Sequence, residues 1–283
     1  MWYPCSEPPG EIDLGRITLP AVKDCPIEGE KLPLVVLSHG GGSSFEQLYD
    51  TAEALADAGF VVASVTHPDK SRDASPFGFL SRMVERPTDV KRLGDFMLDR
   101  SPAASKIDPQ RIGFYGFSLG GYTGLVLIGA DPDWASVPVQ CVGYTFGGNL
   151  CDLVRGKPLP TQPPVHDRRI KAAVLADPGP AFFGPDSFAA VKASVQLWAS
   201  ERGGPRAQVD AVERGLPAPH EYHVVANTGG APVGHFIFFL CPPGLAQAEP
   251  EICTDAPGFD RTAFHKQFNE DVLAFFRVHL GDR

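Results

Sequence analysis

Four short segments of the chain carry the residue types needed to cleave an ester bond. In chain order they are His39-Gly40-Gly41-Gly42, Gly116-Phe117-Ser118-Leu119-Gly120, Asp177 and Gly234-His235. Acyl transfer to a serine requires a hydroxyl nucleophile, a base, a group that orients the base, and N–H donors for the oxyanion. The four segments offer a candidate for each part.

Ser118 is the candidate nucleophile. Its G-x-S-x-G pentapeptide lies between a β-rich run at residues 111–115 and an apolar helical run at 122–130. This is the strand–turn–helix context of a nucleophile elbow, and glycines at 116 and 120 avoid collisions in its strained turn. The alternative is an ordinary serine that caps a helix in a glycine-rich turn. The context favours catalysis.

His235 is the candidate base. It follows a strand-like run, lies in a loop with Gly229, Gly230 and Gly234, and precedes an apolar segment. A base on such a loop can turn its imidazole toward the serine and accept the proton near neutral pH. The other late histidines flank or lie within strand or helix patterns, which favours packing or surface roles: His220, His223, His265 and His279.

Two carboxylates are candidates for the acid that orients the base. Asp177 ends the apolar run at residues 172–176, where a strand tip would point it at the site. Its alternative role is a cap or an Asx turn before Pro178. Glu201 follows a second strand tip, at 197–199, a position that many hydrolases use for their acid. We favour Asp177 and retain Glu201 as the alternative.

The oxyanion hole is expected to combine the backbone N–H groups of Leu119 and Gly41. Glycines let the backbone approach a substrate oxygen without an intervening side chain. His39 is expected to brace the loop from behind. The alternative role of residues 40–42, a phosphate-binding loop, is disfavoured because the segment lacks both the G-x-G-x-x-G spacing and a Walker Lys-Ser/Thr pair.

Buried strands alternate with helical patterns along the chain. Strands are expected at residues 34–37, 60–65, 111–115, 170–176, 194–199 and 221–225. Helices are expected after a capping box of Ser44 and Gln47, from Pro87, at 122–130, near 186–192, near 206–214 and after Asp260. Such alternation predicts the α/β class, with a mostly parallel sheet covered by helices on both faces.

The domain prediction is a single α/β domain over residues 1–283. A chain of 283 residues that is 43% hydrophobic can form one large core. Residues 67–86 show no clear period, and 131–169 are irregular and rich in proline. We therefore expect loop excursions at about 67–86 and 131–169, above one edge of the sheet.

Charge and hydropathy exclude several kinds of partner. The net charge is −9 and no block of Lys and Arg occurs, so nucleic-acid binding is not expected. The longest apolar runs are far shorter than the roughly 18 residues of a membrane-spanning helix. A small-molecule substrate is the expected partner, and no cofactor or metal is expected.

Six cysteines form three pairs that are close in sequence, none with the CxxC spacing of a metal site: Cys5 and Cys25, Cys141 and Cys151, Cys241 and Cys253. Cys241 and Cys253 flank a proline-rich loop and are the first expected disulfide. Disulfides would indicate a periplasmic or secreted protein, and free thiols a cytoplasmic one. Residues 1–4 lack the features of a signal peptide, so a removed leader remains an open alternative.

The chain resembles serine α/β-hydrolases of the predicted dienelactone hydrolase group and their relatives, the platelet-activating-factor acetylhydrolases. The matching segments are Trp2-Tyr3-Pro4, Pro33-Leu34-Val35-Val36-Leu37-Ser38-His39-Gly40, Gly116-Phe117-Ser118-Leu119-Gly120-Gly121, Leu175-Ala176-Asp177 and Gly234-His235-Phe236. The resemblance implies an α/β-hydrolase fold, a serine nucleophile and no metal. It also implies that the acid is Asp177 and that the glycine-loop donor is Gly41. Dienelactone hydrolases proper use a cysteine nucleophile, so the group name does not define the substrate.

The function predicted from these residues is cofactor-free hydrolysis of small or short-acyl carboxylic esters through an acyl-enzyme. An amidase, lactonase or thioesterase would use the same residues, and a non-catalytic binding protein could retain the fold. Six aromatic residues near the expected active edge would form an apolar pocket or, equally, ordinary core: Phe77, Phe79, Phe146, Phe182, Phe183 and Phe236.

Overall fold

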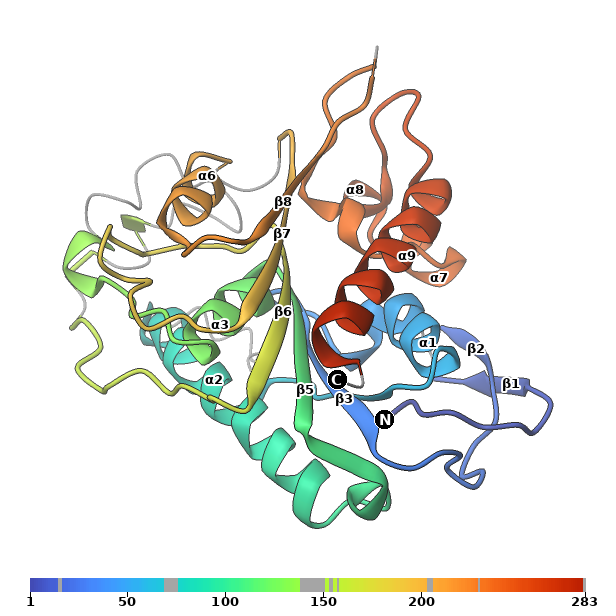
Figure 1. Ribbon diagram of the computed structural model, residues 1–283. Helices are drawn as coiled ribbons and strands as arrows, with labels where there is room; N and C mark the ends of the chain where they lie inside the picture. Colours follow the sequence, from blue (N-terminus) through green and yellow to red (C-terminus); the bar gives the residue numbers. More distant parts are fainter. Residues whose placement is uncertain are drawn as a thin grey trace.

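The computed structural model describes residues 1–14, 17–68, 76–137, 151–152, 155–156, 158–202, 206–228 and 230–281. At its centre lies a six-stranded sheet with the order β4-β3-β5-β6-β7-β8 (Figure 1). All neighbouring strands are parallel. The strands are β3 (Leu32–Ser38), β4 (Val61–Ser64), β5 (Ile107–Phe117), β6 (Ile170–Ala176), β7 (Ser194–Ser200) and β8 (Glu221–Val225).

Helices cover both faces of this sheet. Figure 1 shows α1 (Tyr49–Asp57) and α9 (Arg261–Leu280) on one side, and α2 (Pro76–Asp99), α3 (Leu119–Leu127) and α6 (Arg206–Gly215) on the other. The side chains of β3 alternate between the two hydrophobic cores that result: Leu34 and Val36 pack on the α2–α3 side, Val35 and Leu37 on the α1–α9 side. A strand buried on both faces is therefore continuously apolar, as the sequence indicated.

The predicted α/β class is confirmed, and so are the six predicted strands. The strand expected at 170–176 has those bounds, and the helix expected near 206–214 is α6. Asp260 caps α9, since its Oδ1 accepts a hydrogen bond of 3.0 Å from the N–H of Ala263.

The helix expected to begin at Pro87 begins eleven residues earlier, at Pro76, and Pro87 lies inside α2. The expectation that all of residues 67–86 form a loop was therefore wrong. Leu80, Met83, Val90 and Met97 are buried at helical spacing. The period was hidden because the buried face also includes a charged residue, Arg86. Packing on this face holds the helix together although Pro87 supplies no N–H donor.

Two other local expectations were wrong. No helix forms at 186–192; backbone hydrogen bonds between residues three apart, such as Val191 N–H to Phe188 O, form turns instead. The capping box of Ser44 and Gln47 does not form, because both side chains bond elsewhere. Of the excursion expected at 131–169, the segment 158–169 is irregular, and residues 138–150, 153–154 and 157 lie outside the described residues.

Smaller elements complete the structure. They are the antiparallel pair β1 (Gly10–Asp13) and β2 (Thr18–Ala21), the 3₁₀ helices η1 (Phe45–Leu48), η3 (Ala104–Lys106), η4 (Trp134–Ser136) and η5 (His235–Phe238), and the short helices α7 (Pro243–Ala248) and α8 (Pro250–Cys253). No helix within the described ranges has the length and hydropathy to cross a membrane.

Disulfides join Cys5 to Cys25 and Cys241 to Cys253. The predicted pairing of Cys241 with Cys253 is confirmed. Cys151 is also disulfide-bonded, and Cys141 lies outside the described residues.

Candidate active site

Ser118 occupies a sharp turn between β5 and α3. Its φ of 56° and ψ of −119° lie in a region that side chains rarely adopt. The neighbouring glycines make the turn possible: a Cβ on Gly120 would lie 1.9 Å from the carbonyl oxygen of Ser38, and one on Gly116 would lie 2.3 Å from that of Gly120. The turn therefore presents the Ser118 hydroxyl beyond the end of the sheet.

The structure brings Ser118, His235 and Asp177 into one hydrogen-bonded line. Nε2 of His235 lies 2.8 Å from Oγ of Ser118, and its Nδ1 lies 3.1 Å from Oδ2 of Asp177. With Nδ1–H donating to the carboxylate, Nε2 is left to accept the serine proton. The ring of Phe117 packs 4.8 Å from the imidazole, centroid to centroid.

Asp177 is held from a second direction by Ser200, at the end of β7. Its Oδ1 accepts the Ser200 N–H at 2.9 Å, and its Oδ2 accepts the Ser200 hydroxyl at 2.5 Å. The residue is almost fully buried and has a positive φ of 42° just after β6. The position of the carboxylate is thus fixed by Ser200 as well as by the imidazole.

Glu201 supports the loop that leads to His235. Its Oε2 accepts the backbone N–H groups of Asn227 at 3.1 Å and Val233 at 3.2 Å. The alternative acid therefore holds the ends of the segment 227–233, and Asp177 is the carboxylate bonded to Nδ1 of His235. His265, among the other late histidines, bonds to Asp50 and to the carbonyl of Ile237 in η5.

The two residues expected to supply the oxyanion donors lie close to each other. A Cβ on Gly41 would contact the Leu119 side chain at 3.8 Å, so the glycine loop runs past the first turn of α3. Leu119 is the first residue of that helix, where backbone N–H groups have no partner within the helix and the helix dipole is positive.

Buried side chains brace the glycine loop from behind. Arg86 donates to the carbonyl of His39 at 2.6 Å and to that of Gly40 at 3.0 Å. His39 accepts the His67 N–H at 3.1 Å through Nε2, so its Nδ1–H donates to Gly40 O at 2.7 Å. Gln47 accepts the Gly40 N–H at 2.8 Å, which is why it does not cap a helix.

A second line of serine, histidine and aspartate lies beneath this loop. Nε2 of His67 is 3.0 Å from Oγ of Ser38, and its Nδ1 is 3.0 Å from Oδ2 of Asp89. Ser38 and His67 are completely buried. Burial, with a smaller contribution from the Arg86 charge, lowers the pKa of His67 to about 3.

Arg86 and His67 were not predicted from the sequence to contact the candidate site. The signal available for Arg86 was its spacing, three residues after Met83 and four before Val90, which places it on the buried face of a helix. His67 offered no comparable signal, because its partners lie 22 to 29 residues away in the chain.

Of the aromatic residues expected at this edge, Phe182 and Phe183 are buried in the core, and Phe79 packs against it half-buried. Phe236 lines a pocket of about 210 Å³ beside Gly41. The Phe77 side chain and Phe146 lie outside the described residues.

One protein-family model matches a segment in the first third of the chain. A model of platelet-activating factor acetylhydrolase, isoform II, matches residues 10–88, which include the glycine loop, His67 and Arg86 but not Ser118. Platelet-activating factor acetylhydrolases from Cavia porcellus and Canis lupus familiaris are 41% and 43% identical over 63 residues, 22% of this chain. The match spans only 14% of the length of either relative.

Among solved structures, a ferulic acid esterase from Streptomyces cinnamoneus is similar with a TM-score of 0.59 and 22% identity. The match covers 93% of this chain and 72% of that one, and it shows the fold. The predicted α/β-hydrolase fold is thus confirmed, and the chain resembles the platelet-activating factor acetylhydrolases, as its sequence indicated.

Proposed function

We propose that this protein is a serine hydrolase of small or short-acyl carboxylic esters that needs no cofactor. The observation that carries the proposal is the hydrogen-bonded line of Ser118, His235 and Asp177, with the serine on a strained turn beside two candidate oxyanion donors. The names of the similar proteins, acetylhydrolase and ferulic acid esterase, support an ester as the substrate.

In the proposed reaction, Oγ of Ser118 forms a bond to the ester carbonyl carbon while its proton moves to Nε2 of His235. The carbonyl oxygen becomes an oxyanion, which the N–H groups of Gly41 and Leu119 stabilise by about 3 kcal/mol each. The C–O bond then breaks, and Nε2 returns the proton to the leaving alcohol. Asp177 orients the imidazole and stabilises its charged form throughout.

Water completes the cycle. His235 removes a proton from a water molecule as its oxygen attacks the acyl-enzyme, a second oxyanion forms, and the proton passes to Oγ as the acid departs. Every proton transfer therefore runs through one nitrogen atom, Nε2.

The test is hydrolysis of p-nitrophenyl acetate by the wild type and by Ser118→Ala. We expect the variant to lose about 10⁴-fold or more in kcat, and the wild type to release a burst of p-nitrophenol as the acyl-enzyme accumulates. Ser38→Ala is the matched control and should retain kcat within about tenfold of the wild type. Undiminished turnover by Ser118→Ala would refute the proposal.

We also infer that the protein works in an oxidising compartment, since two disulfides close its N-terminal segment and the loop after η5. Alkylation of the native protein from its source, followed by peptide mass analysis, should find Cys5, Cys25, Cys241 and Cys253 unmodified until reductant is added. Modification of all four without reductant would contradict this location.

A further inference from the structure

We propose that the pocket beside the glycine loop is a subsite for a small apolar group ending in a positive charge, such as an alkylammonium. The group would belong to the acyl or the alcohol half of the ester. This inference rests on the proposed function and adds the chemical class of the substrate to it.

The pocket lies beside the candidate catalytic line. Gly41, one candidate oxyanion donor, lies on its wall together with Phe236. The ring of Phe236 is 5.6 Å from that of His235, centroid to centroid. This placement allows one ester to reach both the pocket and Ser118.

The walls of the pocket are mostly apolar and include Phe239, Leu240, Leu245 and Ile252. Its volume of about 210 Å³ admits a short branched chain and excludes a long acyl chain. The size agrees with the small or short-acyl esters proposed above.

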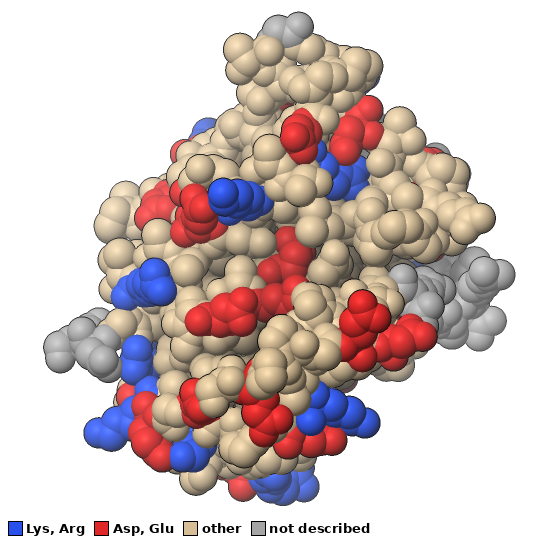
Figure 2. Space-filling model, turned by 90° about the vertical axis from the view of Figure 1, so that its right-hand side faces the viewer, with Lys and Arg blue, Asp and Glu red and all other residues tan. Residues whose placement is uncertain are grey.

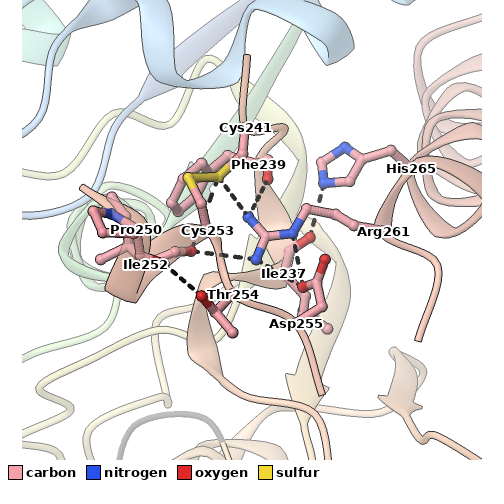
Figure 3. The surroundings of a disulfide bond; sticks show 10 residues. All are labelled: Ile237, Phe239, Cys241, Pro250, Ile252, Cys253, Thr254, Asp255, Arg261 and His265. Carbon is pink, nitrogen blue, oxygen red and sulfur yellow. Dashed lines mark hydrogen bonds and ion pairs between the residues drawn. A yellow bond between two sulfur atoms is a disulfide. The ribbon is translucent and has the colours of Figure 1, made fainter. Parts of the chain in front are cut away.

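The disulfide fixes one wall. Figure 3 shows the bond between Cys241 and Cys253, which closes the loop that contributes Leu245 and Ile252. The buried Arg261 lies against this bond, and its guanidinium donates to the carbonyls of Ile252 at 3.2 Å and Phe239 at 3.4 Å. The pocket is thus preformed, so little ordering opposes binding.

Two carboxylates give the pocket its charge. Glu46 comes from η1 and Glu249 from the disulfide-closed loop, so they approach from separate segments. No Lys or Arg is among the described residues that line the pocket. The nearby Arg261 is already paired with Asp255, at 2.7 Å. The pocket therefore attracts a cation and disfavours an anion.

The charge of this pocket differs from that of the larger pocket at the other end of the sheet. Figure 2 shows the face that carries α1 and α7, with acidic side chains across its middle and basic ones mainly around them. A larger pocket of about 590 Å³, at the opposite end of the sheet, is lined by Asp167 and by four basic residues, Arg168, Lys171, Lys192 and Arg277. Removal of the Glu46 and Glu249 charges therefore tests whether a charge preference arises in this pocket.

The experiment compares two pairs of esters of equal shape, with acid release followed by pH-stat. One pair is acetylcholine and its carbon isostere, in which C(CH₃)₃ replaces N⁺(CH₃)₃. The other is the ethyl ester of γ-trimethylammoniobutyrate and its carbon isostere. The first pair carries the charge in the alcohol half, the second in the acyl half. In one of the pairs we expect kcat/KM to favour the cation by about tenfold at low salt.

Charge-removing variants assign that preference to the pocket. In Glu46→Gln/Glu249→Gln the ratio of kcat/KM for the charged ester to that for the uncharged ester should fall to about one. Glu251→Gln is the matched control, because Glu251 is exposed on the same loop and does not line the pocket; it should keep the wild-type ratio.

Failure of this inference is distinct from failure of the proposed function. Hydrolysis of both members of each pair at equal rates would overturn the charged subsite and leave the esterase intact. A cation preference that survives in the double variant would overturn it too, since the field of the whole protein would then be responsible. Hydrolysis of none of the four esters, nor of p-nitrophenyl acetate, would contradict the proposed function.

Discussion

The molecule contains two lines of serine, histidine and aspartate with nearly the same hydrogen bonds. In one, His235 joins Ser118 to Asp177 at the carboxyl ends of β5 and β6. In the other, His67 joins Ser38 to Asp89 beneath the glycine loop. In both, Nδ1 faces a carboxylate and Nε2 faces a hydroxyl, so residue types and contacts alone do not distinguish them.

Access and surroundings distinguish the two lines. Ser118 lies on a strained turn beside Leu119 and Gly41, whereas Ser38 is the last residue of β3 and is completely buried. Burial, and to a smaller degree the Arg86 charge, lowers the pKa of His67 to about 3, which makes its ring a weak proton acceptor. Under the proposed function, the feature that separates the two lines is space for a substrate together with donors for the oxyanion.

The buried line has a structural use. The backbone N–H of His67 donates to the His39 ring, and that ring donates to the Gly40 carbonyl. Arg86 donates to the carbonyls of His39 and Gly40. We propose that the second line and Arg86 together position the Gly41 N–H for the reaction at the first.

The largest difference is expected for the two aspartates. Asp177→Asn should lower kcat for p-nitrophenyl acetate by about 10⁴-fold, because the amide favours the wrong tautomer of His235. Asp89→Asn, the matched change in the buried line, should leave kcat within about tenfold of the wild type and lower the melting temperature. Equal loss of kcat in the two variants would remove the distinction between the lines.

Arg86→Met should lower kcat by about 100-fold with a smaller change in KM, because the oxyanion donors act mainly in the transition state. The two carbonyls would lose their charged partner, so stability should also fall, by about 3 kcal/mol. Arg86→Lys, which can still reach one carbonyl, should recover part of kcat. A variant that is less stable but has wild-type kcat at a temperature where it is folded would show that Arg86 does not position the loop.

The pH dependence of stability should report on His67. Its pKa of about 3 in the folded protein lies below the unfolded value of 6.5, so between these values the unfolded chain binds a proton that the native state does not. The contribution of His67 to the free energy of unfolding is therefore largest above pH 6.5. Below that pH it falls by about 1.4 kcal/mol per pH unit until the pH reaches the folded pKa. The charged groups that face His67 are Asp89 and Arg86, and the His67→Gln substitution changes neither of them.

The free energy of unfolding of the wild type and of His67→Gln should therefore converge by about 3 kcal/mol between pH 6.5 and roughly pH 4. Urea titrations at several pH values measure this difference. A difference that is constant over the range would mean that His67 is not held neutral by burial.

The smallest effect is expected for Glu201→Gln, which leaves an oxygen to accept the N–H groups of Asn227 and Val233. We expect kcat to fall by no more than about tenfold, since the loop before His235 is loosened but Nδ1 keeps its carboxylate. A loss as large as that of Asp177→Asn would make Glu201 the acid.

The sequence predicted the elements whose signal is local. A continuous apolar run indicated β6 with its observed bounds, and the glycines around Ser118 indicated the turn whose close contacts with Ser38 exclude a side chain. It failed where a residue's partner is distant. Gln47 was predicted to be part of a helix cap but bonds to Gly40. No role was predicted for Arg86, because the carbonyls that it binds lie 46 and 47 residues earlier.

The most direct test of the two lines is covalent labelling of the native protein by a fluorophosphonate, followed by digestion and mass analysis of the peptides that contain Ser38 and Ser118. Such a reagent reacts with a serine that has an activated hydroxyl and an oxyanion site. We predict one adduct per chain, on Ser118, and its loss in His235→Ala. An adduct on Ser38, or labelling that persists without His235, would contradict the account.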